Sequence, residues 1–120
     1  MTKRILTVDD SPSMRMLLKA ALTEQGFQVF QAEDGVDALE KLDAAQPDLI
    51  ITDINMPRMD GFQLIETLRG EAASRLPILV LTTEASDAKK ARAREAGATG
   101  WIVKPFDRDK LGAAIRRVLH

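Results

Sequence analysis

The chain has 120 residues, of which 45% are hydrophobic and 29% are charged, a composition typical of one ordinary globular domain. It contains no cysteine, which excludes disulfides, thiol chemistry and cysteine-ligated metals. The formal net charge of -1 gives no overall attraction to nucleic acid or anionic membranes, and no apolar run has the length of a signal peptide or a membrane span. We therefore expect a cytoplasmic protein that binds neither nucleic acid nor membrane.

The first predicted strand is the apolar run at 5–8, and a helix is predicted to follow it at 13–25. Ser11 suits the start of this helix, and Gly26 suits a left-handed cap at its end. A short, mixed run at 27–30 predicts a second strand, at the edge of a sheet. In the helix at 13–25, the helical spacing of the apolar residues predicts one buried face, formed by Met14, Leu17, Leu18, Ala21 and Leu22.

The middle of the chain continues the alternation of strand and helix. A helix is predicted at 35–45, ending before Pro47. The run at 49–54 begins with continuously apolar residues, which indicates a strand that is covered on both faces. The next helix is predicted at 61–69, with Asp60 as its N-terminal cap.

The last part of the chain predicts a strand at 78–81, a helix at 87–96, a strand at 101–103 and a helix at 107–119. Five strands alternating with five helices predict an α/β fold, with a parallel sheet covered by helices on both faces. We expect one domain over residues 1–120. Because the last predicted helix ends with the chain, we expect no output domain.

Polar side chains follow four of the five predicted strands. In an open parallel sheet the carboxyl ends of the strands meet at one edge, so these side chains should lie together. Carboxylates on neighbouring strands, about 4.8 Å apart, would repel by roughly 3 kcal/mol and need a cation. Oxygen ligands without His or Cys favour Mg²⁺ over zinc. The residues are Asp9 and Asp10, Asp53, Thr82 and Thr83, and Lys104.

A divalent cation beside a carboxylate and a lysine suits phosphoryl transfer, where the phosphoryl oxygens must be neutralised and positioned. An aspartate carboxylate can itself be the nucleophile. Each residue also has a simpler interpretation, as a helix cap, a turn residue, a strand threonine or a solvated lysine. Their coincidence at one predicted edge favours a functional site.

Four motifs resemble the signature of response-regulator receiver domains of the CheY-like, stand-alone chemotaxis type. They are Val-Asp-Asp-Ser at 8–11, Asp-Ile-Asn-Met-Pro-Arg-Met-Asp-Gly at 53–61, Leu-Thr-Thr-Glu at 81–84 and Val-Lys-Pro-Phe at 103–106. The resemblance covers essentially the whole chain, and the motifs fall in the family order at the family spacing. It implies a flavodoxin-like sheet with strand order 2-1-3-4-5.

The resemblance also implies roles for the acidic residues. Asp53 is the expected phosphoacceptor. Asp10, Asp53 and the backbone carbonyl of Asn55 are the expected Mg²⁺ ligands, and Asp9 is expected to act on the metal mainly through water. Lys104 is expected to pair with the acceptor and then with the phosphoryl group.

Residues of the switch are implied in the same way. The hydroxyl of Thr82 is expected to close onto a phosphoryl oxygen, and Trp101 occupies the position of an aromatic ring that then turns inward. Asn55 and Glu84 are expected to tune loss of the phosphoryl group to water. A cis Lys104–Pro105 bond is also implied.

The expected partners are a chemotaxis-type histidine kinase, as phosphodonor, and a flagellar motor switch protein, which CheY-like proteins bind with the face formed by 87–96, 101–103 and 107–119. The predicted helix at 87–96 has no large apolar residue, which favours another acidic protein partner. The residues expected at this partner face are Lys89, Lys90, Arg92, Arg94 and Trp101. A simpler interpretation is a solvated helix with a weak core stripe at Ala88, Ala91 and Ala96.

We expect a monomeric signalling switch that catalyses its own phosphorylation and dephosphorylation, rather than an enzyme. A phosphate sink that drains the kinase and a scaffold that is never phosphorylated remain alternatives. An aspartate-dependent phosphohydrolase would need Asp-x-Asp and a substrate cap, whereas the pair here has no spacer. A nucleotide- or flavin-binding module would need a Gly-rich loop where this chain has Asp-Asp-Ser-Pro-Ser.

Overall fold

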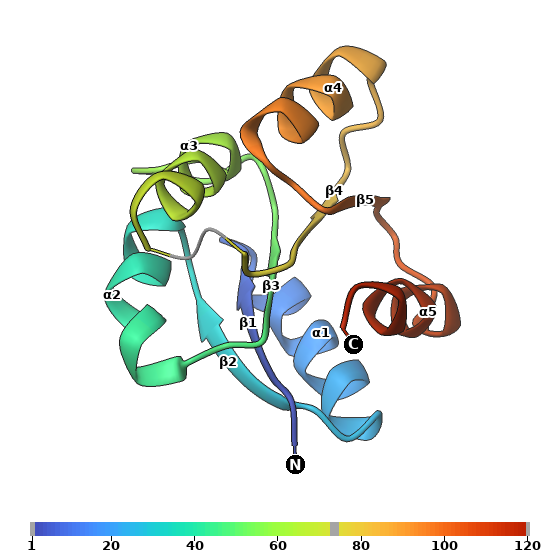
Figure 1. Cartoon of the computed structure of the whole chain (residues 1–120). Helices are drawn as coiled ribbons and strands as arrows, with labels where there is room; N and C mark the ends of the chain where they lie inside the picture. Colours follow the sequence, from blue (N-terminus) through green and yellow to red (C-terminus); the bar gives the residue numbers. More distant parts are fainter. Residues whose placement is uncertain (1, 73–74, 120) are drawn as a thin grey trace.

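The computed structural model describes residues 2–72 and 75–119 and contains a five-stranded parallel sheet (Figure 1). The strands are β1 (Arg4–Val8), β2 (Gln28–Ala32), β3 (Leu49–Thr52), β4 (Ile78–Thr82) and β5 (Gly100–Val103). Their order in the sheet is β2-β1-β3-β4-β5, which confirms the predicted order and the edge position of the second strand.

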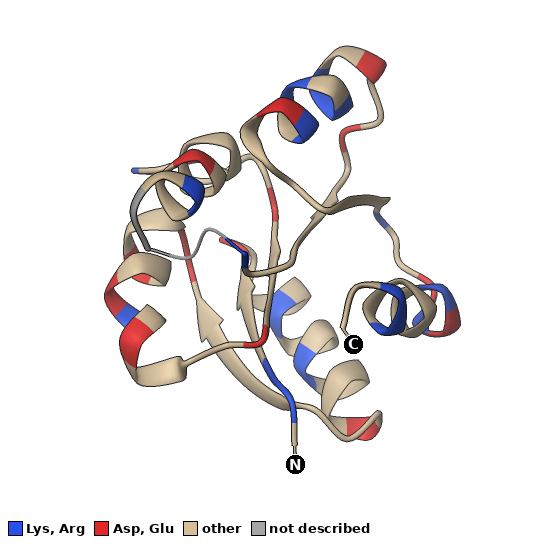
Figure 2. Ribbon diagram, viewed as in Figure 1, with Lys and Arg blue, Asp and Glu red and all other residues tan. Residues whose placement is uncertain are grey.

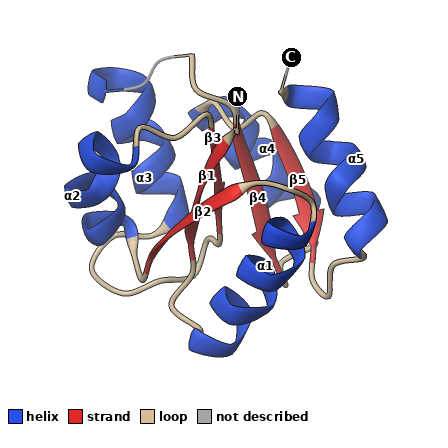
Figure 3. Cartoon of the chain, turned by 90° about the horizontal axis from the view of Figure 1, so that it is seen from below, coloured by secondary structure: helices blue, strands red, loops and turns tan. Residues whose placement is uncertain are grey.

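Helices cover both faces of the sheet (Figures 1 and 3). They are α1 (Pro12–Glu24), α2 (Gly35–Ala45), α3 (Gly61–Thr67), α4 (Asp87–Ala96) and α5 (Arg108–Val118), with a π-helical turn η1 (Leu68–Ala72) continuing α3. Helices α1 and α5 pack on one face, and α2, α3 and α4 pack on the other. Among the described residues, no helix has both the length and the apolar character needed to cross a bilayer.

The two hydrophobic cores follow from the alternation of side chains along each strand. Ile51 and Leu79 contribute to the core under α1 and α5, whereas their neighbours Ile50 and Val80 contribute to the core under the other three helices. All four are at most 2% exposed, and each buried side chain of this size contributes about 1.5–3 kcal/mol. The predicted covering of β3 and β4 on both faces is confirmed.

Polar side chains cap the helices where the chain leaves the carboxyl edge of the sheet. Ser11 accepts a hydrogen bond from the Met14 amide at the start of α1, and Asp60 and Gln63 form a reciprocal capping box on α3. Gly97 ends α4 in the left-handed conformation, with φ of 114°. The Lys104–Pro105 peptide bond is cis, as the resemblance implies.

Some sequence expectations about the helices are wrong. Leu17, expected in the core, is 56% exposed, because the surface of α1 that packs inward is narrower than its apolar stripe. Ala88 and Ala91 of α4 are exposed, and the buried alanine is Ala93. Since the only apolar residues of α4 are alanines, the sequence carries no large side chain that decides which face packs inward. The third helix ends as an α-helix at Thr67, before the predicted end.

Candidate functional site

The sheet brings the predicted site residues to one edge, the carboxyl ends of four adjacent strands. Thr52 pairs with Val8 in the sheet, so the residues that follow them, Asp53 and Asp9, lie side by side. The Asp53 amide donates to the carbonyl oxygen of Val8 at 2.9 Å. On the other side of the site, the Lys104 amide donates to the carbonyl oxygen of Thr82 at 2.7 Å. Backbone pairing therefore sets the spacing of these residues.

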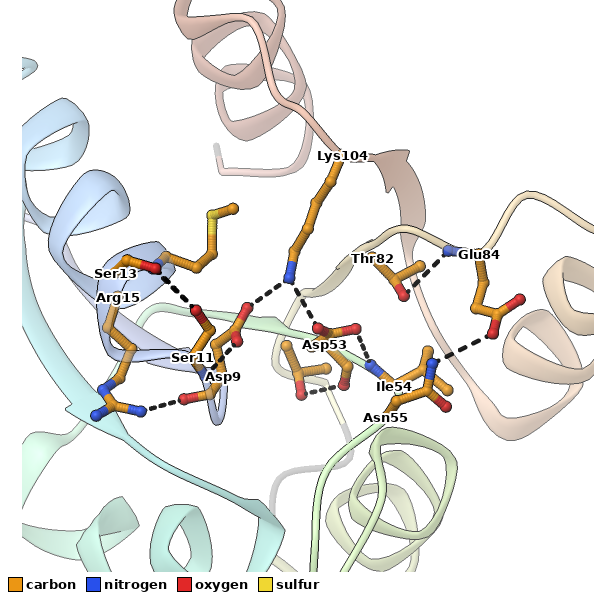
Figure 4. A network of polar contacts seen from close by, with 12 residues as sticks. Asp9, Ser11, Ser13, Arg15, Asp53, Ile54, Asn55, Thr82, Glu84 and Lys104 are labelled. Atoms are coloured by element: carbon orange, nitrogen blue, oxygen red, sulfur yellow. Dashed lines mark hydrogen bonds and ion pairs between the residues drawn. The ribbon is translucent and has the colours of Figure 1, made fainter.

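The Lys104 side chain lies between two carboxylates (Figure 4). Its Nζ donates to Oδ2 of Asp9 and to Oδ2 of Asp53, each at 2.8 Å. The side chains are only 10%, 2% and 11% exposed, respectively. Burial alone lowers the pKa of Lys104, but hydrogen bonds and charges from Asp53 and Asp9 outweigh it, and the pKa is raised above its ordinary value. Lys104 is therefore a fixed positive charge between two carboxylates.

Asp10 completes a group of three carboxylates. One oxygen from each of Asp9, Asp10 and Asp53 lies within 4.8 Å of the other two. Asp9 and Asp53 are buried and Asp10 is exposed, so the group opens to solvent on one side. Three negative charges against the single ammonium of Lys104 leave an excess that a divalent cation would balance. The ligands are all carboxylate oxygens, and they fit Mg²⁺.

Backbone and side-chain donors orient the two buried carboxylates (Figure 4). Oδ1 of Asp53 accepts from the Ile54 amide at 2.6 Å, and Oδ1 of Asp9 accepts from the Ser11 amide at 2.9 Å. Arg15, on the first turn of α1, donates to the backbone oxygen of Asp9 at 2.5 Å. The sequence analysis did not single out Arg15. The feature that could have indicated it is a cation in the first turn of the predicted helix, five residues after the Asp-Asp pair.

Glu84 links three elements beside the acceptor. Its Oε1 accepts from Nδ2 of Asn55 at 3.2 Å and forms an ion pair with Nζ of Lys89 at 2.9 Å. Lys89 and then Asn55 hold the pKa of Glu84 below its ordinary value. The loops after β3 and β4 are thus joined at the two positions predicted to tune dephosphorylation. Those tuning roles, and the metal role of the Asn55 carbonyl, stay predictions.

Thr82 and Trp101 both contact the backbone of Glu84. The buried hydroxyl of Thr82 accepts from the Glu84 amide at 3.3 Å, and the indole Nε1 of Trp101 donates to the Glu84 carbonyl oxygen at 3.1 Å. The Trp101 ring is partly buried against the core under α4. The structure therefore brings the two predicted switch residues, from β4 and β5, to the backbone of Glu84. Movement of the ring stays a prediction.

Helix α4 carries several Lys and Arg residues (Figure 2), and two of its four cations already contact other side chains. Lys89 is paired with Glu84, and the guanidinium of Arg92 lies over the ring of Phe62, 4.0 Å from its centroid. Lys90 and Arg94 line a cavity of about 110 Å³. Trp101 lines the same cavity as Lys90 and Arg94.

The sequence profile of the response regulator receiver domain matches residues 5–116. The chain belongs to this family. It is a receiver domain of a response regulator of two-component signalling, and its fold is the CheY-like flavodoxin fold. The motifs at the strand ends, from which the resemblance was inferred, are the ones that form the site.

A curated relative of the chain is also a response regulator. Response regulator MprA of Mycobacterium tuberculosis (strain ATCC 25618 / H37Rv) is 40% identical over 120 residues, which are 100% of this chain and 52% of that protein. The chain thus spans about half the length of the curated relatives it matches.

Solved structures of similar proteins extend over the whole chain. Chemotaxis protein CheY4 of Vibrio cholerae is 42% identical, with a TM-score of 0.93 over 99% of this chain and 100% of that one. The receiver domain of a signal transduction histidine kinase from Syntrophus aciditrophicus is 35% identical, with a TM-score of 0.90 over 98% of this chain and 90% of that one.

Proposed function

We propose that Asp53 of this receiver domain accepts a phosphoryl group from the phosphohistidine of a histidine kinase. The observation that carries the proposal is the setting of the Asp53 carboxylate at the open edge of the sheet. It lies within 4.8 Å of two other carboxylates and is bonded to Lys104 Nζ at 2.8 Å. This setting suits a nucleophilic carboxylate whose product needs positive charge nearby.

The proposed transfer moves the phosphoryl group from a kinase nitrogen to a carboxylate oxygen of Asp53. An oxygen of Asp53 attacks the phosphorus, the P–N bond to the kinase imidazole breaks, and the released nitrogen retains the electron pair. In the second half of the cycle, water attacks the phosphorus and the P–O bond to Asp53 breaks, which restores the Asp53 carboxylate and yields inorganic phosphate. The domain would catalyse both steps on itself. The ammonium of Lys104 would stay beside the negative charge when that charge passes from Asp53 to the phosphoryl oxygens.

The carboxylates of Asp10 and Asp53, with the backbone carbonyl of Asn55, would hold the Mg²⁺ directly, and Asp9 would act on it mainly through water. When bound, Mg²⁺ would neutralise charge on the phosphoryl oxygens and align them for in-line displacement. Asn55 and Glu84 would govern how readily water reaches the phosphoryl group, because their side chains are hydrogen-bonded beside the acceptor.

The output would be a change in the face formed by α4, β5 and α5. Closure of the Thr82 hydroxyl onto the phosphoryl group would end its contact with the Glu84 amide. Glu84 also accepts the hydrogen bond from Trp101, so the change would reach the ring through this residue. The phosphoryl group can shift this equilibrium only by interacting differently with the two states. Lys90 and Arg94 would then favour an acidic partner segment at the cavity beside Trp101.

A chemotaxis pathway is the proposed context, supported by the 42% identity to the chemotaxis protein CheY4. The phosphodonor would be a chemotaxis-type histidine kinase, and the partner would be a flagellar motor switch protein or another acidic protein. A phosphate sink would use the same acceptor chemistry without an output partner. A scaffold would bind partners without being phosphorylated.

The test combines intact-mass analysis with Trp101 fluorescence, since the chain has one Trp. Wild type, Asp53→Asn and Asp43→Asn are treated with acetyl phosphate, with and without Mg²⁺. Asp43 is an exposed residue near the end of α2 and serves as the matched control. We expect a phosphoryl mass gain and a fluorescence change, both Mg²⁺-dependent, in wild type and Asp43→Asn only. No mass gain in wild type with Mg²⁺ would contradict the proposal and favour the scaffold.

A further inference from the structure

A third buried carboxylate, besides Asp9 and Asp53, lies outside the acceptor site. Asp34 precedes α2 and is 2% exposed. Its Oδ1 caps the helix by accepting from the Asp37 amide at 2.8 Å. Both of its oxygens also accept from Arg58, with 2.7 Å from Nε to Oδ2 and 3.0 Å from the terminal nitrogen to Oδ1. A helix cap requires only one of these contacts, so the two-bond pair with Arg58 needs another explanation.

Arg58 belongs to the loop that carries the acceptor and Asn55. This loop joins β3 to α3, and Arg58 stands in it five residues after Asp53. Its backbone has φ of 64°, in the left-handed region that residues other than Gly, Asn and Asp seldom adopt. The side chain is 51% exposed, so burial of apolar surface does not account for its position. The two hydrogen bonds to Asp34 account for the position of the Arg58 side chain.

A second contact ties the same loop to the start of α2. The Gly35 amide donates to the carbonyl oxygen of Met59 at 3.2 Å. The Met59 side chain lies so close to Gly35 that a Cβ there would be 2.6 Å from its Cγ. One side-chain fork and one backbone bond, on consecutive residues of each segment, thus hold the loop against α2.

We propose that Asp34 is a positioning residue for the phosphoacceptor site: its fork with Arg58 holds the loop between Asp53 and α3 so that Asn55 stays beside the acceptor. The functional part of this inference rests on the proposed Mg²⁺ and phosphoryl chemistry at Asp53. A two-bond arginine–carboxylate pair sets orientation as well as distance, which a single hydrogen bond does not. Residues that orient a metal site from outside it commonly change metal affinity 10–100-fold when they are replaced.

The principal variant is Asp34→Asn, since asparagine caps a helix as well as aspartate does but removes the charge that Arg58 binds. Asp37→Asn is the matched control. Asp37 lies in the first turn of the same helix and loses the same charge, but its side chain pairs with Lys41 of α2 at 3.0 Å. Two quantities are measured: amide hydrogen exchange of residues 55, 56, 58 and 59 in metal-free protein, and the Kd for Mg²⁺ by calorimetry.

We expect faster exchange of the loop amides and a Kd for Mg²⁺ raised about 10-fold in Asp34→Asn, with little change in Asp37→Asn. Arg58→Gly tests the other half of the pair, because glycine accepts the left-handed backbone without strain. Arg58→Gly should weaken Mg²⁺ binding as Asp34→Asn does. The double variant with both changes should bind Mg²⁺ no more weakly than either single variant, because both remove the same interaction.

The inference is overturned if Asp34→Asn behaves like Asp37→Asn, or if the loop amides exchange faster while Mg²⁺ affinity is unchanged. A wild-type protein that binds no Mg²⁺ at millimolar concentration would instead contradict the proposed function. In that case the exchange data decide separately whether Asp34 holds the loop.

Discussion

The indole Nε1 of Trp101 donates a hydrogen bond to the backbone carbonyl oxygen of Glu84, with 3.1 Å between the two atoms. Through its amide and its side chain, Glu84 also contacts Thr82 and Asn55. The ring on β5 is therefore two hydrogen bonds away from the loop that carries the acceptor.

Replacing Trp101 with Phe retains an aromatic ring in the core and removes this donor. We expect the free energy of unfolding to fall by about 1 kcal/mol, the typical contribution of one hydrogen bond, plus a small loss of packing. Urea denaturation followed by circular dichroism measures it. A variant as stable as wild type would mean that solvent replaces the bond at no cost.

Lys104→Met removes the ammonium between Asp9 and Asp53 and leaves two mostly buried carboxylates facing each other. Removing one partner of a buried ion pair typically costs 3–5 kcal/mol, and we expect a loss of about 3 kcal/mol without Mg²⁺ because the site is open on one side. Added Mg²⁺ should restore part of it by binding the folded state. Lys41→Met, which breaks an ion pair whose lysine side chain is 50% exposed, is the control and should change stability by less than about 1 kcal/mol. Equal losses in the two variants would contradict the assignment.

Gly61→Ala should be strongly destabilising. A Cβ at Gly61 would lie 2.9 Å from the backbone Cα of Ile54, which cannot move without shifting the acceptor loop. We expect a loss of about 1–3 kcal/mol, as for other overpacked sites. Gly70→Ala is the control, since its Cβ would meet nothing within 4 Å, and alanine there should leave stability unchanged or raise it. Thermal denaturation of both variants distinguishes backbone clash from a general effect of alanine.

Acid should remove the contribution of Asp34 to stability. The hydrogen bonds from Arg58 hold the pKa of Asp34 below its ordinary value of 3.8, against the opposing effect of burial. A carboxyl whose pKa is lowered by folding stabilises the fold above its unfolded pKa, and this stabilisation is lost as pH falls through the folded pKa. The difference in unfolding free energy between wild type and Asp34→Asn should thus be constant from pH 7 to about 5 and shrink below 3.8.

The charged groups around this pair affect the same titration. The backbone amide of Asp37 helps to keep Asp34 ionised, while Glu33 and Glu40 help to keep Arg58 charged. Asp37→Asn keeps this amide and removes the Asp37 charge, so measuring it over the same pH range isolates the effect of that charge. A difference between wild type and Asp34→Asn that stays constant from pH 5 to 2 would contradict the expected linkage.

Most of the fold was predictable from local patterns. Strands β3 and β4 were recognisable because their apolar residues do not alternate, and the cap at Asp60 because an acidic residue precedes an amphipathic stretch. The third helix was less so: its α-helical geometry ends at Thr67, and a π-helical turn takes its place from Leu68. That change depends on how the helix end packs, which has no local sequence signal.

Which residues meet at the sheet edge was predictable from the sequence, because parallel strands end at the same edge and the residue after each strand is therefore placed there. Two features were decided only by the tertiary structure. The face of α4 that packs inward, marked by Ala93, depends on its neighbours because no large apolar side chain favours one face. The pair between Asp34 and Arg58 joins residues 24 positions apart on different loops. Its geometry exists only once α2 and the acceptor loop have packed against the same sheet.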